Sequence, residues 1–514
     1  MPRNAELKPE TALRYNFAGT ALKPFNQRTR NMPELKVLFA TSEMAPLIKT
    51  GGLADVSGAL PAALRAAGVD VRVLLPGYTP VLAQLPQHEV VAVFDMPGFP
   101  PARLLAGDTA TEVPLLVLDC PELYQRAGGP YQDSDGRDWG DNPRRFALLS
   151  RIAAILASAD TPLSWKPDLL HCNDWQTGLA PAYLHFWHGK TPSVMTIHNL
   201  AFQGVFPPHL LGELHLPPSS FAIGGVEYYG NLSFLKAGLY YADHITTVSP
   251  NYAQEIQREP LGFGMQGLLA QRRDRLTGIL NGIDTDEWNP AGDDFLAKKY
   301  SAARMIGKAA DKQALQQRMG LADEPDMPLL GVVSRFTHQK GLDLLLEVVP
   351  RLIDLPVKLV MLGSGEAQLQ HTARELAALY PGKIGAHIGF SEELSHLIEA
   401  GADMFVMPSR FEPCGLNQFY SQRYGTPPIV HATGGLADSV VDCTPETLKD
   451  GSASGFVFGE MTAENLHATI LRAVELYRDR KQWKTLCKHC MAKDFSWQHS
   501  AEAYLEVYRG VLGR

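Results

Sequence analysis

The sequence predicts an α/β protein built from two doubly wound parallel sheets that are covered by helices. Short apolar runs of strand length alternate with helical patterns along both halves of the chain. Polar residues or glycines follow most of these runs directly. The chain has 514 residues, which is more than one hydrophobic core usually supports. We therefore expect two domains that bind ligands at the carboxyl ends of their strands.

In the first half, β-branched and aromatic residues over 37–41 predict a buried strand, and a helix is expected over 57–67. Apolar residues at helical spacing predict a second helix over 144–159. Further apolar runs predict strands over 69–75, 115–118, 168–171, 193–197 and 245–248. This alternation is typical of a parallel sheet.

The second half repeats the pattern without evident sequence similarity to the first. A helix begins at Leu342, and strands are expected over 329–334, 357–362, 404–407 and 428–431. The turn Asn281-Gly282-Ile283-Asp284 marks the boundary between the halves. We expect Rossmann-like domains over 34–280 and 281–494 that face each other across a cleft, with 495–514 packing back on the first domain.

Composition and charge indicate a globular enzyme. Hydrophobic residues make up 45% of the chain and charged residues 20%. The net charge of −8 argues against nucleic acid or an anionic membrane as the main partner. No run of about 18 apolar residues is present to span a bilayer.

The cysteines and the N-terminal residues bear on the compartment. Six cysteines at irregular spacing do not predict a disulfide framework, and Cys487-Lys488-His489-Cys490 has no second pair with which to bind a metal. We therefore expect a reducing, cytoplasmic location. Residues 1–33 lack the apolar core of a signal peptide and are expected to form an unstructured extension, with a transit peptide as the alternative.

The loop Lys49-Thr50-Gly51-Gly52-Leu53-Ala54-Asp55 lies between the first predicted strand and the first predicted helix. A loop in this position presents backbone N–H groups and a positive helix end to a phosphate. Gly51 and Gly52 remove two side chains where an anion must approach, and Lys49 adds a mobile cation. The alternative is a tight turn with a solvated lysine.

A second strand-to-helix loop is Ser334-Arg335-Phe336-Thr337-His338-Gln339-Lys340-Gly341. Arg335 and Lys340 are cations five positions apart that can converge on a diphosphate, one as a bidentate guanidinium and one as a point charge. They suit a leaving group that gains negative charge. The alternative is a solvated basic loop.

A third segment, Pro408-Ser409-Arg410-Phe411-Glu412-Pro413-Cys414-Gly415-Leu416, follows another predicted strand. Proline next to Glu412 holds its carboxylate rigidly, so that it can bind sugar hydroxyls and oppose positive charge at an anomeric carbon. Backbone N–H groups of Cys414, Gly415 and Leu416 would face a ligand at the helix start, and Cys414 need not be a nucleophile. The alternative for Glu412 is a helix-capping acid.

Polar side chains at strand ends mark the edge of each sheet where a ligand is expected. One ligand between the two domains could be touched from both sides by Glu43, Lys49, Asp174, His198, Arg335, Lys340 and Glu412. For His198 the alternative is a core or capping histidine.

Eight segments, in the same order along the chain, resemble those of the bacterial glycogen synthases and plant starch synthases, which are glycosyltransferases of the GT-B fold. The resemblance extends from Lys36 to about Tyr508. The segments are Lys49-Thr50-Gly51-Gly52-Leu53, Asn173-Asp174-Trp175, Thr196-Ile197-His198-Asn199-Leu200, Asn281-Gly282-Ile283-Asp284, Ser334-Arg335-Phe336, Gln339-Lys340-Gly341, Pro408-Ser409-Arg410-Phe411-Glu412-Pro413-Cys414-Gly415-Leu416 and Thr433-Gly434-Gly435-Leu436.

The resemblance implies ADP-glucose as the donor and a growing α-1,4-glucan as the acceptor. Arg335 and Lys340 would hold the diphosphate and stabilise departing ADP. Lys49 and the amides of Gly51 and Gly52 would approach the same phosphates.

The resemblance also implies contacts to the sugars and the base. Glu412 would bind glucose hydroxyls near the reacting centre. Asp174 would be a polar contact on the acceptor side, and Asn417 would lie near the nucleoside. Phe390 would stack on adenine, with simple packing as its alternative. The glucose itself would also be held by His198, Asn199 and Asn281.

Retention of configuration is implied as well. A retaining hydrolase uses two carboxylates about 5 Å apart, and no matching pair is evident. Many retaining enzymes of this fold carry a second glutamate eight positions after the first, where this chain has Tyr420. We therefore expect front-face attack, in which a leaving phosphate oxygen takes the acceptor proton, and no metal or other cofactor.

Other functions are weaker fits. A nicotinamide-dependent oxidoreductase is disfavoured because Gly363-Ser364-Gly365-Glu366 is too short a match to Gly-x-Gly-x-x-Gly. A transferase that uses another donor, such as UDP-glucose, stays open. So does a catalytically silent glucan-binding scaffold, although Lys49, Arg335 and Glu412 are all present and count against it.

Overall fold

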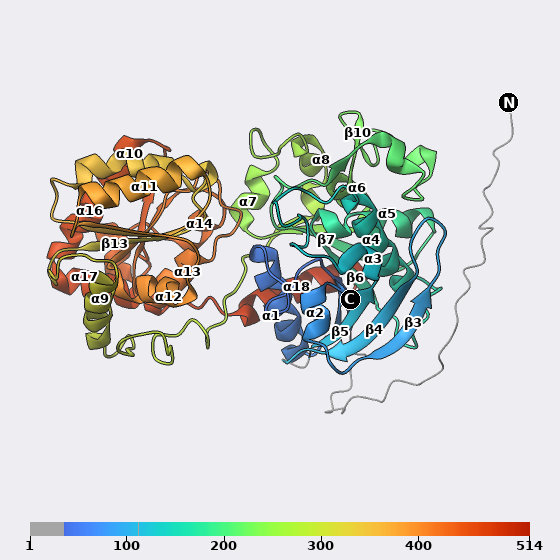
Figure 1. Cartoon of the computed structure of the whole chain (residues 1–514), viewed down its shortest axis with the longest axis horizontal. Helices are drawn as coiled ribbons and strands as arrows, with labels where there is room; N and C mark the ends of the chain where they lie inside the picture. Colours follow the sequence, from blue (N-terminus) through green and yellow to red (C-terminus); the bar gives the residue numbers. More distant parts are fainter. Residues whose placement is uncertain (1–34, 111–112) are drawn as a thin grey trace. The chain divides into compact units, whose positions relative to one another are not determined.

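The computed structural model describes residues 35–110 and 113–514, which divide into two compact units (Figure 1). The first unit contains the chain up to Thr246 together with Ile256–Thr277 and Ser500–Arg514. The second contains Thr247–Glu255 and Gly278–His499. The extension expected over 1–33 lies outside the described residues.

One short segment lies in a different unit from the one expected. Helix α7 (Pro250–Glu255) was assigned to the first domain, but it packs with α14 (Gly434–Ser439) of the second unit. Ser249 Oγ donates to the Asp438 carboxylate at 2.5 Å, and a Glu255 carboxylate oxygen accepts from the amide of Gly434 at 3.0 Å. These contacts hold 247–255 against α14.

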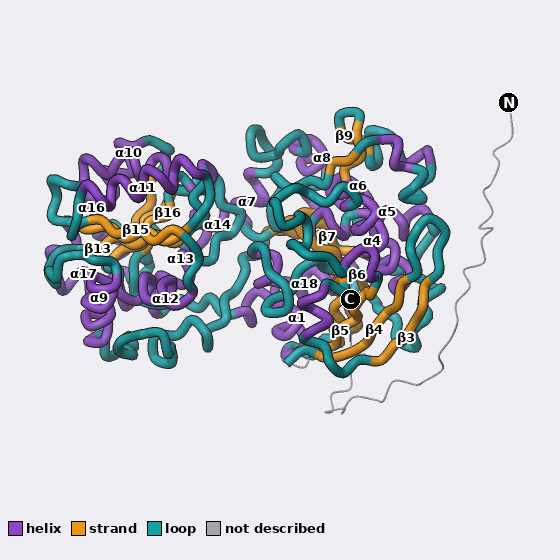
Figure 2. The backbone as a smooth tube through the Cα atoms, in the orientation of Figure 1, coloured by secondary structure: helices purple, strands orange, loops and turns teal. Residues whose placement is uncertain are grey.

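The first unit is built around a nine-stranded sheet (Figure 2). The pairings β1–β2, β1–β6, β2–β5 and β6–β7 are parallel, whereas β3, β4 and β5 form an antiparallel edge that was not predicted. From edge to edge the strands are β12 (Leu276–Gly278), β11 (His244–Thr247), β7 (Ser193–Ile197), β6 (Leu169–Asn173), β1 (Lys36–Ala40), β2 (Asp70–Pro76), β5 (Pro114–Asp119), β4 (Ala102–Asp108) and β3 (Glu89–Phe94).

Helices cover this sheet. The predicted helix after β1 is α1 (Gly52–Ala66), which packs on β2. The predicted helix over 144–159 is α4 (Asn142–Ala157), whose residues are buried along nearly its whole length, as in a helix covered on all sides. The other helices of the unit are α2 (Thr79–Ala83), α3 (Pro121–Tyr124), α5 (Leu179–Phe186), α6 (Phe234–Tyr241), α8 (Gln266–Gln271) and most of α18 (Trp497–Leu512). A small antiparallel sheet joins β8 (Val205–Phe206), β10 (Asn231–Ser233) and β9 (Glu227–Tyr228).

The C-terminal helix is anchored in the first unit by a buried hydrogen-bond chain. The Tyr508 hydroxyl lies 2.7 Å from His171 Nδ1, and His171 Nε2 lies 2.6 Å from Thr196 Oγ1. Both His171 and Tyr508 are fully buried. Burial lowers the pKa of His171 to about 3, so the ring is neutral and needs these partners.

The second unit contains a six-stranded sheet in which every pair is parallel. Its order is β15 (Ile384–Ile388), β14 (Lys358–Gly363), β13 (Leu329–Val333), β16 (Met404–Met407), β17 (Pro428–His431) and β18 (Phe456–Phe458). Numbered within the unit this order is 3-2-1-4-5-6, the order of a doubly wound dinucleotide-binding sheet. The sheet confirms the predicted Rossmann-like fold.

Both faces of this sheet are covered, as continuous apolar strands require. On β14, Leu359 and Met361 pack with α10 (Leu342–Leu352), α11 (Ala367–Leu379) and α16 (Ala463–Arg478). Val360 and Leu362 pack on the other face with α9 (Ile306–Arg318) and α12 (Glu392–Gly401). Figure 1 shows α9 and α12 on the opposite side of the sheet from α10 and α11. The remaining helices are α13 (Asn417–Arg423), α15 (Pro445–Asp450) and α17 (Arg480–Met491).

All six cysteines are free thiols. None of the described helices combines the length and the hydrophobicity that crossing a bilayer would need.

Candidate functional site

Each of the two large sheets reverses its strand order next to its first strand, and most predicted site residues lie on loops beside these two reversals. The reversal lies between β1 and β6 in the first unit and between β13 and β16 in the second. Ligands of doubly wound sheets bind at the carboxyl ends of strands at such points. Six of the fifteen predicted residues belong to the first unit and nine to the second.

A buried carboxylate organises the loop that follows β1. Glu43 is 2% exposed, and its oxygens accept from the Thr50 amide at 2.5 Å, the Thr50 hydroxyl at 2.6 Å and the Gly51 amide at 3.3 Å. The Tyr131 hydroxyl also donates to Glu43. These bonds satisfy a charge that would otherwise be costly to bury. Glu43 therefore fixes the start of α1, and the Gly51 amide predicted to meet a phosphate already has a partner.

The predicted phosphate loop is open on its outer side. Lys49 is half exposed and pairs with Asp55 at 2.6 Å, so it is an accessible cation with an internal partner. A Cβ atom added to Gly51 or to Gly52 would meet no atom within 4 Å. No described residue therefore requires glycine at these two positions, whereas close approach of a ligand would.

Asp174, His198 and Asn199 lie together at the ends of β6 and β7. An Asp174 carboxylate oxygen accepts from the His198 amide at 2.8 Å, and the Asn199 side-chain oxygen accepts from the Ala201 amide at 3.0 Å. His198 Nε2 lies 3.0 Å from the Asn173 side-chain oxygen. Asp174 has a φ of 53°, a value rare outside glycine, and such strained backbone clusters at functional sites.

Burial sets the charge of this group. It raises the pKa of Asp174 to about 7, and nearby Glu43 adds to the rise, while amide bonds from His198 and Asn199 oppose it. Burial lowers the pKa of His198 to about 3. At neutral pH His198 is uncharged and Asp174 exchanges a proton, so both can make neutral hydrogen bonds to hydroxyl groups.

In the second unit, glycine brings two loops into contact. Gly341 has a φ of 66°, and a Cβ there would lie 1.8 Å from the Pro408 carbonyl oxygen. Only glycine allows the loop after β13 to lie this close to the loop after β16. The predicted cations and the predicted carboxylate are therefore placed side by side.

Lys340 and Glu412 form the centre of this group. Lys340 Nζ lies 2.5 Å from a Glu412 carboxylate oxygen, and the Ser409 hydroxyl donates to the same oxygen at 3.0 Å. The side chains are 19% and 7% exposed. Arg335, on the same loop as Lys340, is exposed and forms no ion pair within the described residues. The loop after β13 therefore carries one exposed guanidinium and one ammonium that is paired with a buried carboxylate.

Arg410 is a positioning residue that sequence analysis passed over. Its guanidinium binds both Asp343 oxygens at 2.7 Å and donates to the His338 carbonyl at 2.6 Å. Burial opposes ionisation of Asp343, but the hydrogen bonds from Arg410 outweigh it and hold the pKa of Asp343 below its usual value. The bidentate pair ties the Glu412 loop to the start of α10. The only signal of this role in the sequence is that Arg410 is a cation two positions before Glu412.

The residues that follow Glu412 lead into α13. Cys414 is buried, and burial raises the pKa of its thiol to about 12, so it is not a thiolate nucleophile. Gly415 has a φ of 73°, which favours glycine, and Leu416 is the N-cap of α13. Asn417 donates to the Val333 carbonyl at 2.6 Å, which ties α13 to the end of β13.

Two further glycines support this loop and were quoted only as part of a motif. A Cβ on Gly434 would lie 2.0 Å from the Glu412 carbonyl oxygen, and one on Gly435 would lie 2.2 Å from the Cys414 carbonyl oxygen. The Gly435 amide donates to the Glu412 carbonyl at 3.0 Å. The start of α14 therefore packs directly on the Glu412 backbone.

Asn281, Phe390 and Tyr420 complete the predicted set. Asn281 is 7% exposed, and its side-chain oxygen is buried without a hydrogen-bond partner, as expected of a ligand contact. Phe390 is 88% exposed and packs on little of the chain. Tyr420 stacks on Trp288 with 3.6 Å between ring centroids, so packing accounts for the aromatic residue that stands where related folds carry an acid.

Comparisons with known proteins show the family to which the chain is similar. Residues 36–271 match the family described as the starch synthase catalytic domain, and residues 315–488 match glycosyl transferases group 1. The chain is 60% identical over 480 residues to a glycogen synthase of Nitrosomonas eutropha, covering 92% of this chain and 96% of that protein. It is 56% identical over 491 residues to a glycogen synthase of Nitrosospira multiformis, covering 94% and 99%.

Solved structures give the same result. The catalytic domain of starch synthase IV from Arabidopsis thaliana, bound to ADP and acarbose, matches with a TM-score of 0.82 and 30% identity, over 94% of this chain and all of that one. A sucrose-phosphate synthase from Thermosynechococcus elongatus shares the fold, with a TM-score of 0.56 at 17% identity over 93% of this chain and all of that one. The resemblance inferred from the eight sequence segments is confirmed.

Proposed function

The chain belongs to the glycogen and starch synthase family of glycosyltransferases, and from this premise we propose that it transfers glucose from ADP-glucose to the non-reducing 4-hydroxyl of an α-1,4-glucan with retention of configuration. The observation that carries the proposal is the Lys340–Glu412 pair at the strand reversal of the second unit, with exposed Arg335 on the same loop as Lys340. The ADP bound to the Arabidopsis relative supports the choice of nucleotide.

Arg335 and Lys340 bind the diphosphate and stabilise ADP as it leaves. Negative charge grows on the leaving phosphate, and preorganised cations act on that charge without reorganising. Lys340 also holds Glu412 in place, where its carboxylate binds glucose hydroxyls and opposes positive charge at the anomeric carbon. With charge supplied by side chains, transfer needs no metal or other cofactor.

The acceptor hydroxyl attacks from the face that ADP leaves. A leaving phosphate oxygen takes the proton of the acceptor hydroxyl. One glycosidic bond forms as one sugar–phosphate bond breaks, so the step is balanced. No protein base is required. Tyr420, which stacks on Trp288, supplies no second carboxylate.

The residues of the first unit complete the recognition of donor and acceptor. Lys49 and the open Gly51–Gly52 backbone approach the phosphates. Neutral His198 and Asn199 hold the donor glucose, and Asp174 binds an acceptor hydroxyl.

The other residues of the second unit bind the nucleoside side of the donor. The unpartnered side-chain oxygen of Asn281 accepts from a sugar hydroxyl. Exposed Phe390 stacks on adenine, because an aromatic ring left in water gains by covering a base. Asn417 lies near the nucleoside, with backbone N–H groups of Cys414, Gly415 and Leu416 at the start of α13. Neither nucleic acid nor a membrane is a partner, and the protein acts in the cytoplasm.

The test is transfer of labelled glucose to glycogen in EDTA, with ADP-glucose and UDP-glucose compared. We expect rapid transfer from ADP-glucose. Arg335→Ala and Lys340→Ala should each slow it about a hundredfold, the loss of about 3 kcal/mol typical of one preorganised donor. Glu412→Ala should abolish it.

The matched control is Arg351→Ala, which removes an arginine of α10 that pairs only with surface Glu464. Its transfer rate should equal that of the unaltered chain. A preference for UDP-glucose would overturn the donor assignment. Tight glycogen binding without transfer from either donor would favour the silent scaffold.

A further inference from the structure

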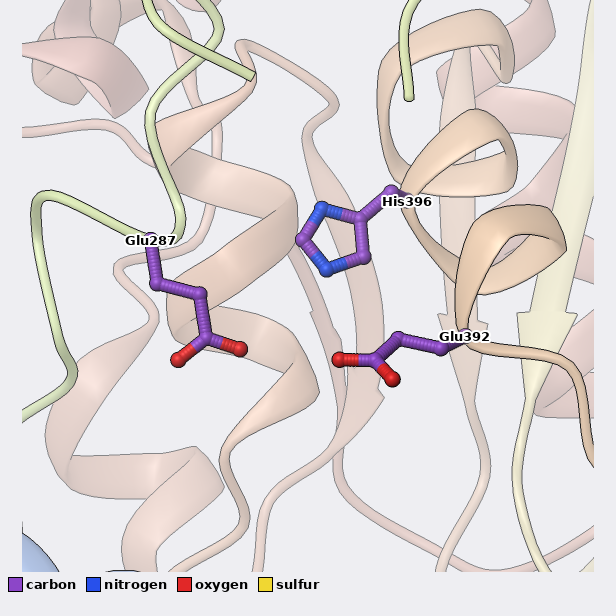
Figure 3. Close-up of side chains that lie close together, drawn as sticks. All are labelled: Glu287, Glu392 and His396. Atoms are coloured by element: carbon purple, nitrogen blue, oxygen red, sulfur yellow. The ribbon is translucent and has the colours of Figure 1, made fainter. Parts of the chain in front are cut away.

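We propose that Glu287, Glu392 and His396 form a binding site for a divalent cation of the zinc class. One side-chain ligand atom from each residue lies within 4.8 Å of the other two, and Figure 3 shows the three side chains converging. The site belongs wholly to the second unit. It uses none of the residues assigned to glucose transfer, so either proposal can fail without the other.

A fixed orientation makes His396 a ready ligand. The residue is 1% exposed, and its ring stacks on Trp288 with 3.9 Å between centroids. Its Nδ1 lies 2.8 Å from an Asp293 carboxylate oxygen, which also accepts from the Tyr424 hydroxyl at 2.5 Å. An imidazole that donates from Nδ1 to a carboxylate presents the lone pair of Nε2, the arrangement found behind metal-bound histidines.

The second nitrogen of this ring has no partner. His396 Nε2 is buried and forms no hydrogen bond with any described residue. In Figure 3 the edge of the ring that carries it faces the carboxylates of Glu287 and Glu392. A divalent cation bound to this nitrogen and to both carboxylates would give the buried nitrogen the partner that it lacks among the described residues.

The donor set selects the kind of cation. One imidazole nitrogen with two carboxylate oxygens suits zinc, whereas magnesium and calcium prefer sites made of oxygen alone. Glu392 and His396 are four positions apart on α12 and therefore share one face of that helix. Glu287 and Glu392 are exposed at the surface, which gives a metal ion a way in.

No metal ligand was predicted from the sequence, because Glu287 comes from a distant loop and the three residues match no ligand spacing. That loop is shaped locally, since an Asp284 carboxylate oxygen accepts from the amides of Asp286 and Glu287 at 2.9 and 3.1 Å. A bound cation would cross-link the loop to the first turns of α12.

The test is Zn²⁺ titration of the full metal-free chain by calorimetry, with bound metal measured after dialysis. We expect the unaltered chain to bind about one more equivalent than the double variant E287Q/E392Q, or to bind it about tenfold or more tightly. Both changes lie at the surface and replace a carboxylate by an amide of nearly the same shape. The matched control is D286N/E393Q, which removes two exposed acids next to the ligands and should bind Zn²⁺ like the unaltered chain.

A second readout uses thermal unfolding. Saturating Zn²⁺ should raise the unfolding temperature of the unaltered chain and of D286N/E393Q, but not that of E287Q/E392Q. Equal Zn²⁺ stoichiometry and affinity in E287Q/E392Q would overturn the site. Binding of Mg²⁺ as tight as that of Zn²⁺ would overturn the assignment to the zinc class.

Discussion

Asp174 combines a strained backbone, burial and a shifted proton affinity. In the folded chain its pKa is about 7, above the ordinary 3.8, because burial disfavours the carboxylate. The folded state therefore holds a proton that the unfolded chain releases between about pH 4 and 7. The stability this proton contributes is complete below pH 4 and is lost as the pH rises to 7.

Replacing Asp174 by Asn should remove this loss. Unfolding free energy of Asp174→Asn should rise with pH more steeply than that of the unaltered chain, by up to about 1.4 kcal/mol per pH unit between pH 4 and 7. Buried His171 and His198, whose pKa values are about 3, contribute an opposite slope that both chains share. Urea unfolding at several pH values measures the difference.

Asp95→Asn is the control, because Asp95 is an exposed acid of the same unit. Its pH dependence should match that of the unaltered chain. Parallel curves for Asp174→Asn and the unaltered chain would show that Asp174 is ionised in the fold.

The sequence could single out candidate residues by their type and position, but it could not give their contacts. Lys340 and Glu412 were chosen as candidates because each follows a predicted strand. Their 2.5 Å contact joins positions 72 apart, which no local pattern reveals. Glu43 was placed at a strand end, but its partner Tyr131 is 88 positions away. The resemblance predicted that Asn281 contacts a ligand. That its side-chain oxygen lacks a hydrogen-bond partner among the described residues could be seen only in the packed structure.

At the scale of elements, the glycines of the loops after β1 and after β13 differ in why a side chain is absent. Gly52 begins α1 and a Cβ would meet nothing, while Gly341 has a φ of 66° and a Cβ would strike Pro408. Gly52→Ala should therefore raise unfolding free energy by up to about 1 kcal/mol, since alanine is the better helix former. It should nevertheless weaken ADP binding, measured by calorimetry.

Gly341→Ala is the contrasting change and should lower unfolding free energy by a few kcal/mol, about 2 or more, from backbone strain and overlap. If Gly52→Ala bound ADP as tightly as the unaltered chain, the open loop would not be a phosphate contact.

The strands that were predicted are the ones buried on both faces, because such strands appear in the sequence as continuous apolar runs. The β1, β7, β13 and β16 runs are of this kind. Strands β3 and β4 were missed because they extend the sheet antiparallel, outside the expected alternation of strand and helix. β18 has three residues, and β15 is only partly buried, so neither gives a strong signal.

At the scale of the whole molecule, the C-terminal helix α18 joins residues that lie far apart in the sequence, since Tyr508 contacts His171. Tyr508→Phe leaves Nδ1 of buried His171 without its partner and should cost about 1–3 kcal/mol of unfolding free energy. Hydrogen exchange should show the loss in β6 and β7 and leave the sheet of the second unit protected as before. The control is Tyr229→Phe, since Tyr229 is 76% exposed. Equal loss of protection in both units would contradict this role.

The order in which the chain passes through the units has a consequence for its synthesis. Every strand of the first sheet has left the ribosome before Tyr508 has been made, because Gly278–His499 intervenes. At ordinary translation rates that interval lasts on the order of ten to forty seconds. During it, Gly278–His499 of the second unit is made in succession, after Thr247–Glu255 has already been made. Until Tyr508 is made, the space that it occupies beside His171 stays empty in the nascent first unit. The first unit is therefore the part of the new protein on which we expect chaperones to act.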